Sequence, residues 1–480
     1  MSLMLVNTPY TFDDWGGKRT SYFDMARRQN RPEDLATLPG EHLGLMSIKA
    51  YCASKGIPVH VVNGMLENQT LPSQTFASIE AAAAVHGAPE LIGFSGTNFV
   101  FRDSLEIIRL CRERWPDVRT CLGYDFATLN FERVLRDFPE VDFICRGEGE
   151  RMFATLAETV AARRTSYELI PGLAYRAANG AIIANAPRPI ASLDDLPWAA
   201  RDEVKRTLEM GLAVGVFGSR GCPYRCAYCT TGQTAALMGS KGYRERSVIA
   251  LVDEMEFLVR DHGVHHVSIT DDLFVTKGLP SQERAAAFAQ ELIRRKLPVE
   301  FMLDCRVDSI SRELFGQLVQ AGLSKVFIGI ETGSEEQLAF YNKRYMLKEG
   351  GPLAQLRILL DLGIKIIPGL IPFHPYVTTK ELRATVNLIE AIGYPGTYLV
   401  NRVKPYPGTP LYDDYEAKGL LTRGEWPVMD WDFPEDRMYD FTKRLDFLGS
   451  NPDCKQDEVL CEFHRQLDAW DAEAASTRAA

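Results

Sequence analysis

The sequence lacks long apolar runs and strongly basic segments. No stretch of roughly 18 or more apolar residues occurs in the 480-residue chain, and the opening MSLMLVNTPY does not have the basic-then-apolar order of a secretory signal. The net charge is −10, and no arginine- or lysine-rich stripe interleaves with aromatic residues. These absences predict a cytoplasmic protein that neither crosses a membrane nor binds nucleic acid.

Cysteine is clustered at only one place in the chain. Ten cysteines in a protein expected to be cytoplasmic indicate free thiols or metal ligands, not disulfides. Seven of them are scattered, mostly in apolar surroundings, and we expect these seven to be buried, unreactive thiols. The scattered set is Cys52, Cys111, Cys121, Cys145, Cys305, Cys454 and Cys461. The other three, Cys222, Cys226 and Cys229, stand together in RGCPYRCAYC with the spacing CxxxCxxC.

Apolar strand-like runs alternate with helical stretches in two parts of the chain. In residues 1–168 the runs LMLVNTP, PVHVV, ELIGFSG, VRTCLGY and DFICRG predict an α/β domain with a doubly wound parallel sheet of Rossmann type. Residues 169–210 contain Asn-Gly at 179–180 and predict a hairpin followed by a linker. Six runs between 211 and 412 predict a partial (β/α)6 barrel similar to a TIM barrel, and 413–480 a helical cap.

The clustered cysteines predict a metal centre with three protein ligands. Zinc sites and most iron–sulfur sites take four ligands from the protein. The nearest other cysteine or histidine residues are Cys145 and His262, so the sequence offers no fourth zinc ligand nearby. Three thiolates on a four-iron cluster leave one iron open to another ligand. An electron carrier or an iron–sulfur sensor would need full ligation by the protein, which disfavours that class of function.

This cysteine loop resembles that of the radical SAM superfamily. The resemblance rests on RGCPYRCAYC, ITDDLF, GIETGS and KPYPGTPLY, each at the end of a predicted barrel strand. It implies that Cys222, Cys226 and Cys229 hold a 4Fe-4S cluster whose open iron binds S-adenosylmethionine. Reduction of the cluster then cleaves this cofactor to methionine and a 5′-deoxyadenosyl radical. An electron donor such as flavodoxin or ferredoxin, with its reductase, is the partner that this chemistry implies.

The resemblance also implies roles for single residues near the strand ends. Tyr228, just before the last cysteine, is expected to pack against the adenine of S-adenosylmethionine. Asp271 or Asp272 is expected to accept a hydrogen bond from its ammonium group, although an aspartate that caps a loop is an equal alternative for each. Glu331 of GIETGS stands where the family has a cofactor-contacting acid.

Polar residues of one parity mark the third predicted barrel strand, VEFMLDCRVD. Glu300, Asp304 and Arg306 are expected to face the barrel lumen, although a solvated edge strand would show the same alternation. His374 follows the fifth strand and is either a packed loop residue or a catalyst. We expect Glu300, Asp304 and His374 to act as acid–base catalysts, and Arg306 and Lys404 to bind the cofactor or a substrate.

The N-terminal domain resembles the cobalamin-binding domain of one radical SAM branch. LPGEHLGLMSIKAYCASKGIPVHVV and VDFICRGEGE carry this resemblance. The motif DxHxxG, which supplies an axial histidine, is absent, and Gly123-Tyr124 stands where the branch commonly has Gly-Gly. Because glycine alone allows close backbone approach at low cost, we expect the domain to have kept its fold and lost cobalamin.

Two reactions on a small molecule remain open. Without cobalamin, the chain is similar to the radical SAM diol dehydratase of apramycin biosynthesis, which removes a hydroxyl from the aminoglycoside precursor paromamine. An acidic lumen would suit such a cationic aminocyclitol, and an NADPH-dependent reductase is an expected downstream partner. With cobalamin, the architecture resembles methyltransferases that act on natural-product precursors. Dehydration is the main expectation, and methyl transfer the alternative.

Overall fold

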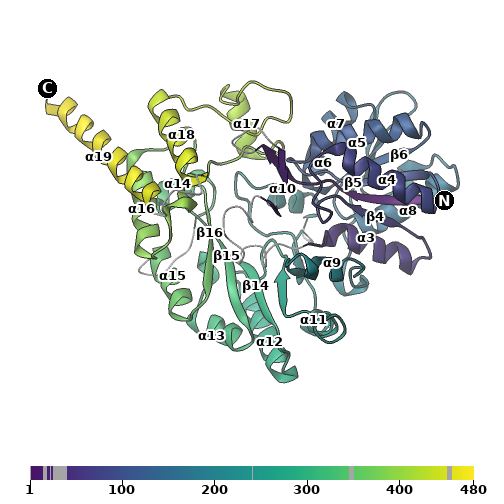
Figure 1. The fold of residues 1–480 in the computed structure, drawn as a ribbon, viewed down its shortest axis with the longest axis horizontal. Coiled ribbons are helices and arrows are strands. Elements are labelled where there is room, and N and C mark those ends of the chain that lie inside the picture. Colours follow the sequence, from purple (N-terminus) through teal and green to yellow (C-terminus); the bar gives the residue numbers. More distant parts are fainter. Residues whose placement is uncertain are drawn as a thin grey trace. The chain divides into compact units, whose positions relative to one another are not determined.

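The computed structural model describes most of the chain as two compact units (Figure 1). The described residues are 2–13, 19–21, 23–24, 40–239, 242–344, 351–450 and 457–479. The first unit comprises Met1–Pro223 and Thr230–Asp272, and the second comprises Tyr224–Cys229 and Leu273–Ala480. This division differs from the predicted domains, because the first two barrel strands belong to the first unit and part of the cysteine loop belongs to the second.

The N-terminal sheet has five parallel strands in the order β4-β1-β5-β6-β7. They are β1 (Ser2–Asn7), β4 (His60–Asn63), β5 (Pro89–Ser95), β6 (Arg119–Gly123) and β7 (Phe143–Cys145). β1 is buried along its whole length and β5 at all positions except one. A strand covered on both faces needs a continuous apolar sequence, which these strands have. The predicted doubly wound parallel sheet is therefore confirmed.

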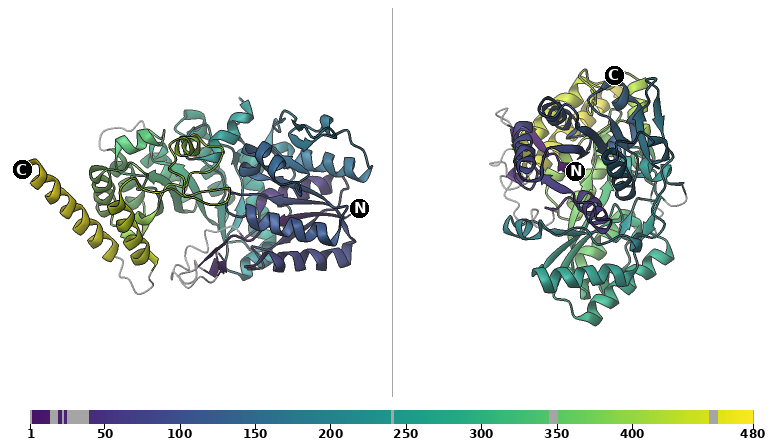
Figure 2. Two further views of the ribbon diagram at one scale, coloured as in Figure 1. Left: turned by 90° about the horizontal axis from the view of Figure 1, so that it is seen from above. Right: turned by 90° about the vertical axis from the view of Figure 1, so that its right-hand side faces the viewer.

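Helices cover both faces of this sheet (Figure 2). α3 packs against α8, and α4 packs against α5. The helices are α3 (Leu43–Ser54), α4 (Pro72–His86), α5 (Phe101–Arg114), α6 (Tyr124–Leu129), α7 (Phe131–Asp137) and α8 (Gly149–Ala161). Each follows a strand or another helix at the carboxyl-terminal edge of the sheet, so that edge is where loops gather.

The predicted hairpin is present, but it extends the N-terminal sheet. β8 (Leu173–Arg176) pairs antiparallel with β9 (Ile182–Ala184) across a turn in which Gly180 has φ 83°. A positive φ is the conformation that an Asn-Gly turn supplies. β8 also pairs antiparallel with β7, so the hairpin forms the edge of the seven-stranded sheet. α9 (Val204–Glu209) follows it.

Five parallel strands belong to the predicted barrel. In the first unit β10 (Val214–Val216) pairs with β13 (His266–Ile269). In the second unit β14 (Glu300–Arg306), β15 (Leu323–Glu331) and β16 (Lys365–Leu370) are adjacent parallel strands. The helices between them are α10 (Thr230–Leu237), α11 (Val248–His262), α12 (Leu279–Arg295), α13 (Arg312–Gln320), α14 (Glu335–Phe340) and α15 (Gly351–Asp361). α16 (Thr379–Ala391) follows β16. The α/β fold class is therefore confirmed.

The sixth predicted barrel strand does not form. A 3₁₀ helix spans Gly396–Val400, and only an isolated bridge joins Phe373 to Arg402. The C-terminal region is helical as predicted, with α17 (Pro410–Ala417), α18 (Asp436–Ser450) and α19 (Glu458–Ala479). No helix within the described ranges has both the length and the apolar character needed to cross a membrane.

Candidate functional site

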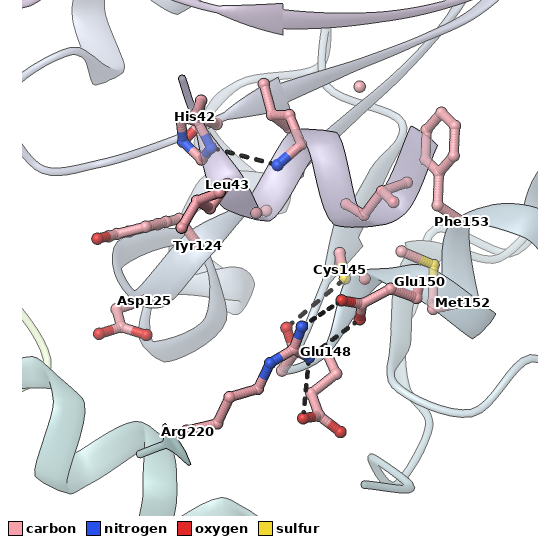
Figure 3. A pocket seen from close by; sticks show the side chains of 18 of the residues that line it. His42, Leu43, Tyr124, Asp125, Cys145, Glu148, Glu150, Met152, Phe153 and Arg220 are labelled. Carbon is pink, nitrogen blue, oxygen red and sulfur yellow. Dashed lines mark hydrogen bonds and ion pairs between the residues drawn. The ribbon is translucent and has the colours of Figure 1, made fainter. Parts of the chain in front are cut away.

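A cavity of about 360 Å³ lies at the carboxyl-terminal edge of the N-terminal sheet, within the first unit (Figure 3). One wall is formed by residues at or near the ends of β5, β6 and β7, together with the start of α3 and of α8. The opposite wall is formed by Phe217 and Ser219–Gly221, which follow β10, and by Thr270 and Asp272, which follow β13. Ligands of open parallel sheets bind at this edge, outside the carboxyl ends of the strands.

Small residues make up much of the wall on the side of the N-terminal sheet. Gly93, Gly123, Gly147 and Gly149 all line the cavity, so main-chain atoms face the space. Gly147 has φ 95°, a conformation that side chains rarely adopt, where the chain turns from β7 into α8. This backbone wall allows a large, flat ligand to approach the sheet edge closely.

Tyr124 leaves the cavity open. Its φ of 80° is the left-handed conformation that glycine adopts most easily, and its side chain is 54% exposed. The ring lies at the side of the cavity near His42, with the ring centroids 6.4 Å apart (Figure 3). The backbone at Tyr124 therefore has the conformation that glycine would adopt, and the ring lies at the side of the cavity without filling it.

His42 is a cavity residue that the sequence analysis missed. Its Nδ1 accepts a hydrogen bond from the Leu45 N–H and caps α3, and its Nε2 lies 2.8 Å from Ser95 Oγ. Burial lowers the pKa of His42 to about 4, so the imidazole is neutral at physiological pH. The available signal was its place directly before an apolar helix, which is the position of an N-cap.

Two carboxylates line the side of the cavity beside Tyr124. Burial and the nearby Asp272 carboxylate raise the pKa of Asp125 to about 6. Thr230 donates to Asp125 over 3.2 Å, and Thr231 donates to Asp272 over 3.0 Å. Asp271 is different, because it is buried and accepts hydrogen bonds from the Gly218 N–H and the Ser219 hydroxyl. Asp271 therefore caps the chain ahead of the cysteine loop, and Asp272 faces the cavity.

Residues 224–229 of the cysteine loop are held in the second unit by main-chain hydrogen bonds. The Ala227 N–H donates to the Tyr341 carbonyl over 2.9 Å, and the Leu411 N–H donates to the Ala227 carbonyl over 3.0 Å. The Asn342 side chain donates to the Arg225 carbonyl. The loop is therefore fixed by the ends of α14 and α17, which lie far from it in the sequence.

Tyr228, Glu331 and Lys343 form a buried polar group in the second unit. Tyr228 donates a hydrogen bond of 2.9 Å to Glu331 Oε1, and the Lys343 ammonium forms an ion pair with the same oxygen. Burial and the Glu331 carboxylate raise the pKa of Tyr228 well above its ordinary value, so its phenol remains a donor. Glu331 has φ 63°, a strained conformation of the kind that clusters at functional sites. Lys343 was not expected from the sequence, because the residue type of a lysine gives no signal of burial.

The three clustered cysteines are divided between the units. Cys222 belongs to the first unit, whereas Cys226 and Cys229 belong to the second and form a turn with a hydrogen bond from the Cys229 N–H to the Cys226 carbonyl. Among the described residues, no three His, Cys, Asp or Glu side chains are grouped to hold a metal ion. The assignment of these thiols as cluster ligands therefore rests on their spacing in the sequence.

The structure separates the polar residues of the third barrel strand. Glu300 is exposed at the amino-terminal end of β14, Asp304 is half-buried, and Arg306 is buried at the carboxyl-terminal end. The Arg306 guanidinium lies 3.9 Å from the ring centroid of Tyr224 and pairs with Asp308. Arg306 thus contacts the cysteine loop, whereas Glu300 lies at the opposite end of its strand from the loops that follow the carboxyl ends.

His374 and Lys404 lie in different environments. His374 is buried and stacks on Phe340 with ring centroids 4.3 Å apart. Burial lowers the pKa of His374 to about 4, and its Nε2 has no hydrogen-bond partner within the described part of the chain. Lys404 is exposed. Arg402, which shares its parity, packs over Trp431. The environment of His374 is that of a packed loop residue, and its Nε2 is the one feature that would suit a ligand contact.

Most of the scattered cysteines are buried, as expected. Cys52, Cys111, Cys121, Cys145 and Cys305 are buried. Burial raises the pKa of each of these thiols, which makes them unreactive. Cys461 is exposed, contrary to expectation, and Cys454 lies outside the described residues.

Two family models match separate parts of the chain. Residues 36–157 match the B12 binding domain, and residues 216–389 match the radical SAM superfamily. An uncharacterised methyltransferase of Pyrococcus horikoshii is 25% identical over 394 residues, which are 81% of each chain. An anaerobic magnesium-protoporphyrin IX monomethyl ester cyclase of Rubrivivax gelatinosus is 29% identical over 286 residues, which are 58% of this chain and 49% of the cyclase.

Solved structures of cobalamin-dependent enzymes have the same fold. The radical enzyme OxsB, with aqua-cobalamin and S-adenosylmethionine bound, has a TM-score of 0.73 at 16% identity and covers 97% of this chain and 75% of its own. The radical S-adenosylmethionine methyltransferase TsrM of Kitasatospora setae has a TM-score of 0.66 at 18% identity. That match covers 88% of this chain and 77% of TsrM.

These findings overturn the expectation that cobalamin is absent. That expectation assumed that Tyr124 crowds the cofactor position, but its backbone is left-handed and its ring leaves the cavity open. The B12-binding model covers this region, and OxsB, which has the same fold, contains cobalamin. The comparisons do not show the expected similarity to a diol dehydratase. The chain therefore combines a B12-binding domain with a radical SAM domain.

Proposed function

We propose that this protein is a cobalamin-dependent radical SAM methyltransferase that acts on a small molecule. The observation that carries this proposal is the cavity of the first unit. One wall of this cavity is the carboxyl-terminal edge of the sheet in the B12-binding domain. The other wall includes Ser219–Gly221, which directly precede Cys222 in the sequence. A cofactor in this cavity would lie against the start of the cysteine loop. Several relatives have names that describe methyl transfer, including TokK of Streptomyces tokunonensis and the hopanoid C-3 methylase of Methylococcus capsulatus.

The residues of the cysteine loop suit an iron–sulfur cluster and S-adenosylmethionine. Cys222, Cys226 and Cys229 would hold the cluster, which supplies one-electron reduction of the cofactor when both are bound. The Glu331 side chain receives two donors on Oε1, from Tyr228 and Lys343, so Oε2 can accept a hydrogen bond from a ligand. A flavodoxin or ferredoxin with its reductase would be the electron donor.

The cavity suits cobalamin through its apolar side and its glycine wall. Cobalamin bound there would supply a carrier for a methyl group. Leu5, Met152 and Phe153 give the cavity an apolar side that excludes water, and the glycine wall lets a macrocycle approach the sheet edge. His42 is already engaged by Leu45 and Ser95, so it stays in place as part of the wall.

No observation favours the diol dehydration expected from the sequence. That reaction was expected to use acids in the barrel lumen, and Glu300 is exposed at the amino-terminal end of β14. Asp304 is half-buried, and His374 is buried among aromatic rings. The acid–base role expected for these three residues therefore stays a prediction, and the relatives named for methyl transfer support the other reaction.

The proposal is tested with anaerobically reconstituted full-length protein. Equilibrium dialysis with hydroxocobalamin should show one-to-one binding, and iron and sulfide should be present in equal amounts. With reductant, S-adenosylmethionine should be converted to S-adenosylhomocysteine only when cobalamin is present. Incubation with paromamine supplies the opposing result: cobalamin-independent 5′-deoxyadenosine together with a product lighter by one water would overturn methyl transfer and restore dehydration.

A further inference from the structure

Two arginines lie directly opposite each other beside the cysteine loop. β11 (Ser219–Arg220) pairs antiparallel with β12 (Arg244–Glu245), and the register places Arg220 across from Arg244. Like charges in this arrangement repel each other. Arg220 is also only two residues before Cys222. An anionic partner is therefore needed to hold the two side chains together at the start of the loop.

Glu148 of the B12-binding domain is this anionic partner. Its Oε1 accepts hydrogen bonds from Arg220 over 3.2 Å and from Arg244 over 2.8 Å. Its Oε2 accepts from Arg244 over 3.1 Å and from the Ile190 N–H over 2.6 Å. The carboxylate thus joins both arginines of the β11–β12 ribbon to the turn between β7 and α8.

Glu150 completes the group with a second carboxylate. Arg220 donates to both of its oxygens, and the Ser47 hydroxyl donates to Oε1 over 2.7 Å. Glu150 lies in the first turn of α8, where the helix dipole favours a negative charge. We name Glu148, Glu150, Arg220 and Arg244 the arginine clamp. It contains two positive and two negative charges.

The clamp is largely buried, and three of its residues form part of the cavity wall. The exposed fractions of its side chains are 3% for Glu150, 11% for Glu148 and Arg244, and 21% for Arg220. Glu148, Glu150 and Arg220 line the cavity, and Figure 3 shows the Arg220 guanidinium between the two carboxylates. Because these charges are largely shielded from water, loss of one partner would leave another charge poorly compensated.

We propose that the arginine clamp couples occupancy of the cavity to the ordering of the cysteine loop at Cys222. A ligand in the cavity restrains the clamp carboxylates, which restrain Arg220 and, through it, the chain before Cys222. The coupling is reciprocal, because any ligand that orders the loop must raise affinity in the cavity by the same factor. This inference rests on the proposed function in that hydroxocobalamin is taken as the cavity ligand.

The test measures backbone amide hydrogen exchange of residues 219–222 in the full-length, cluster-free protein, with and without hydroxocobalamin. Glu148→Gln keeps the shape of the side chain and removes its charge. Glu462→Gln is the matched control, because Glu462 also contacts two arginines, Arg444 and Arg465, and its side chain is 12% exposed. Glu462 lies on α19 in the second unit. Hydroxocobalamin should slow exchange of 219–222 about tenfold in the wild type and in the control.

Glu148→Gln should exchange faster than the wild type without ligand and lose the slowing by hydroxocobalamin, even at concentrations where dialysis shows that the ligand is bound. Full slowing in this variant would overturn the coupling. Should Glu148→Gln fail to fold, Arg244→Lys replaces it, since lysine keeps the charge but cannot form the two-pronged contact. Hydroxocobalamin should slow the amide exchange of residues 219–222 less in Arg244→Lys than in the wild type. Equal slowing in the two proteins would again overturn the coupling.

If dialysis shows that the wild-type protein binds no hydroxocobalamin, the proposed function is contradicted, and this outcome is separate from the test of the clamp. The clamp is then judged from the ligand-free proteins. Faster exchange of 219–222 in Glu148→Gln than in Glu462→Gln supports ordering of the loop by the clamp. Equal rates overturn it.

Discussion

Tyr228, which stands between Cys226 and Cys229, donates a 2.9 Å hydrogen bond to Glu331 at the end of β15. Lys343 contacts the same carboxylate oxygen. Gly329 leaves room for this arrangement, because a Cβ there would crowd Lys343 Nζ and Glu331 Oε1 unless these side chains moved. Three segments that are distant in the sequence thus meet at one buried carboxylate, and the cysteine loop is attached to the barrel there.

Lys343→Met should destabilise the protein strongly. Both side chains of the Lys343–Glu331 pair are less than one-tenth exposed, so removal of the lysine leaves a buried carboxylate unpaired and should cost about 3–5 kcal/mol of unfolding free energy. Lys380→Met is the control, since both Lys380 and its partner Glu336 are exposed and water screens their attraction, so the pair should contribute little. Urea unfolding measures both values. Equal losses in the two variants would contradict a special role for the buried pair.

Single Ala substitutions of Cys222, Cys226 or Cys229 should abolish the visible absorption of the reconstituted protein and most of its iron. In this prediction the protein supplies only these three thiolates to the cluster, so loss of any one of them removes the cluster. Circular dichroism should show that each variant folds. Cys305→Ser should keep its iron, since this thiol is buried within β14, and exposed Cys461→Ser should match the wild type. A full iron content in any of the three alanine variants would show that the ligand set is different.

Tyr124→Gly should leave hydroxocobalamin binding intact. Glycine adopts a φ of 80° without the steric cost that tyrosine has, and the exposed ring contributes little buried area. Dialysis should therefore give an affinity within about tenfold of the wild type, a difference of about 1.4 kcal/mol. Phe153→Ala serves as contrast, because this buried residue of the cavity wall should cost about 3–5 kcal/mol of stability. A larger loss of affinity in Tyr124→Gly would identify the ring as a ligand contact.

His374→Phe should make the protein less sensitive to acid. Burial lowers the pKa of His374 from 6.5 to about 4, so between these values the unfolded chain binds a proton that the folded chain does not. Stability therefore falls as the pH decreases through this window. Phenylalanine keeps the stacking on Phe340 and removes the titration. Urea unfolding at pH 7.5 and pH 5 should show a smaller loss for the variant. Equal losses would mean that His374 is protonated as easily in the folded state as in the unfolded chain.

Features with a local signal were predictable from the sequence. The apolar runs of β1 and β5 predicted a sheet covered on both faces, because a strand buried on both sides needs apolar residues at successive positions. The turn at Gly180 followed from the Asn-Gly pair, whose backbone suits a hairpin. The spacing of Cys222, Cys226 and Cys229 also needed no structure to be recognised.

Contacts between distant segments were decided only by the tertiary structure. Glu148 and Arg220 are 72 positions apart and Tyr228 and Glu331 are 103 apart, so no periodicity in the sequence relates them. Lys343 looks like an ordinary surface lysine until the fold buries it against Glu331. The mistaken expectation about cobalamin has the same origin. The residue type of Tyr124 indicated a blocked site, but its left-handed backbone and the direction of its ring depend on the packing around it, which the sequence alone does not contain.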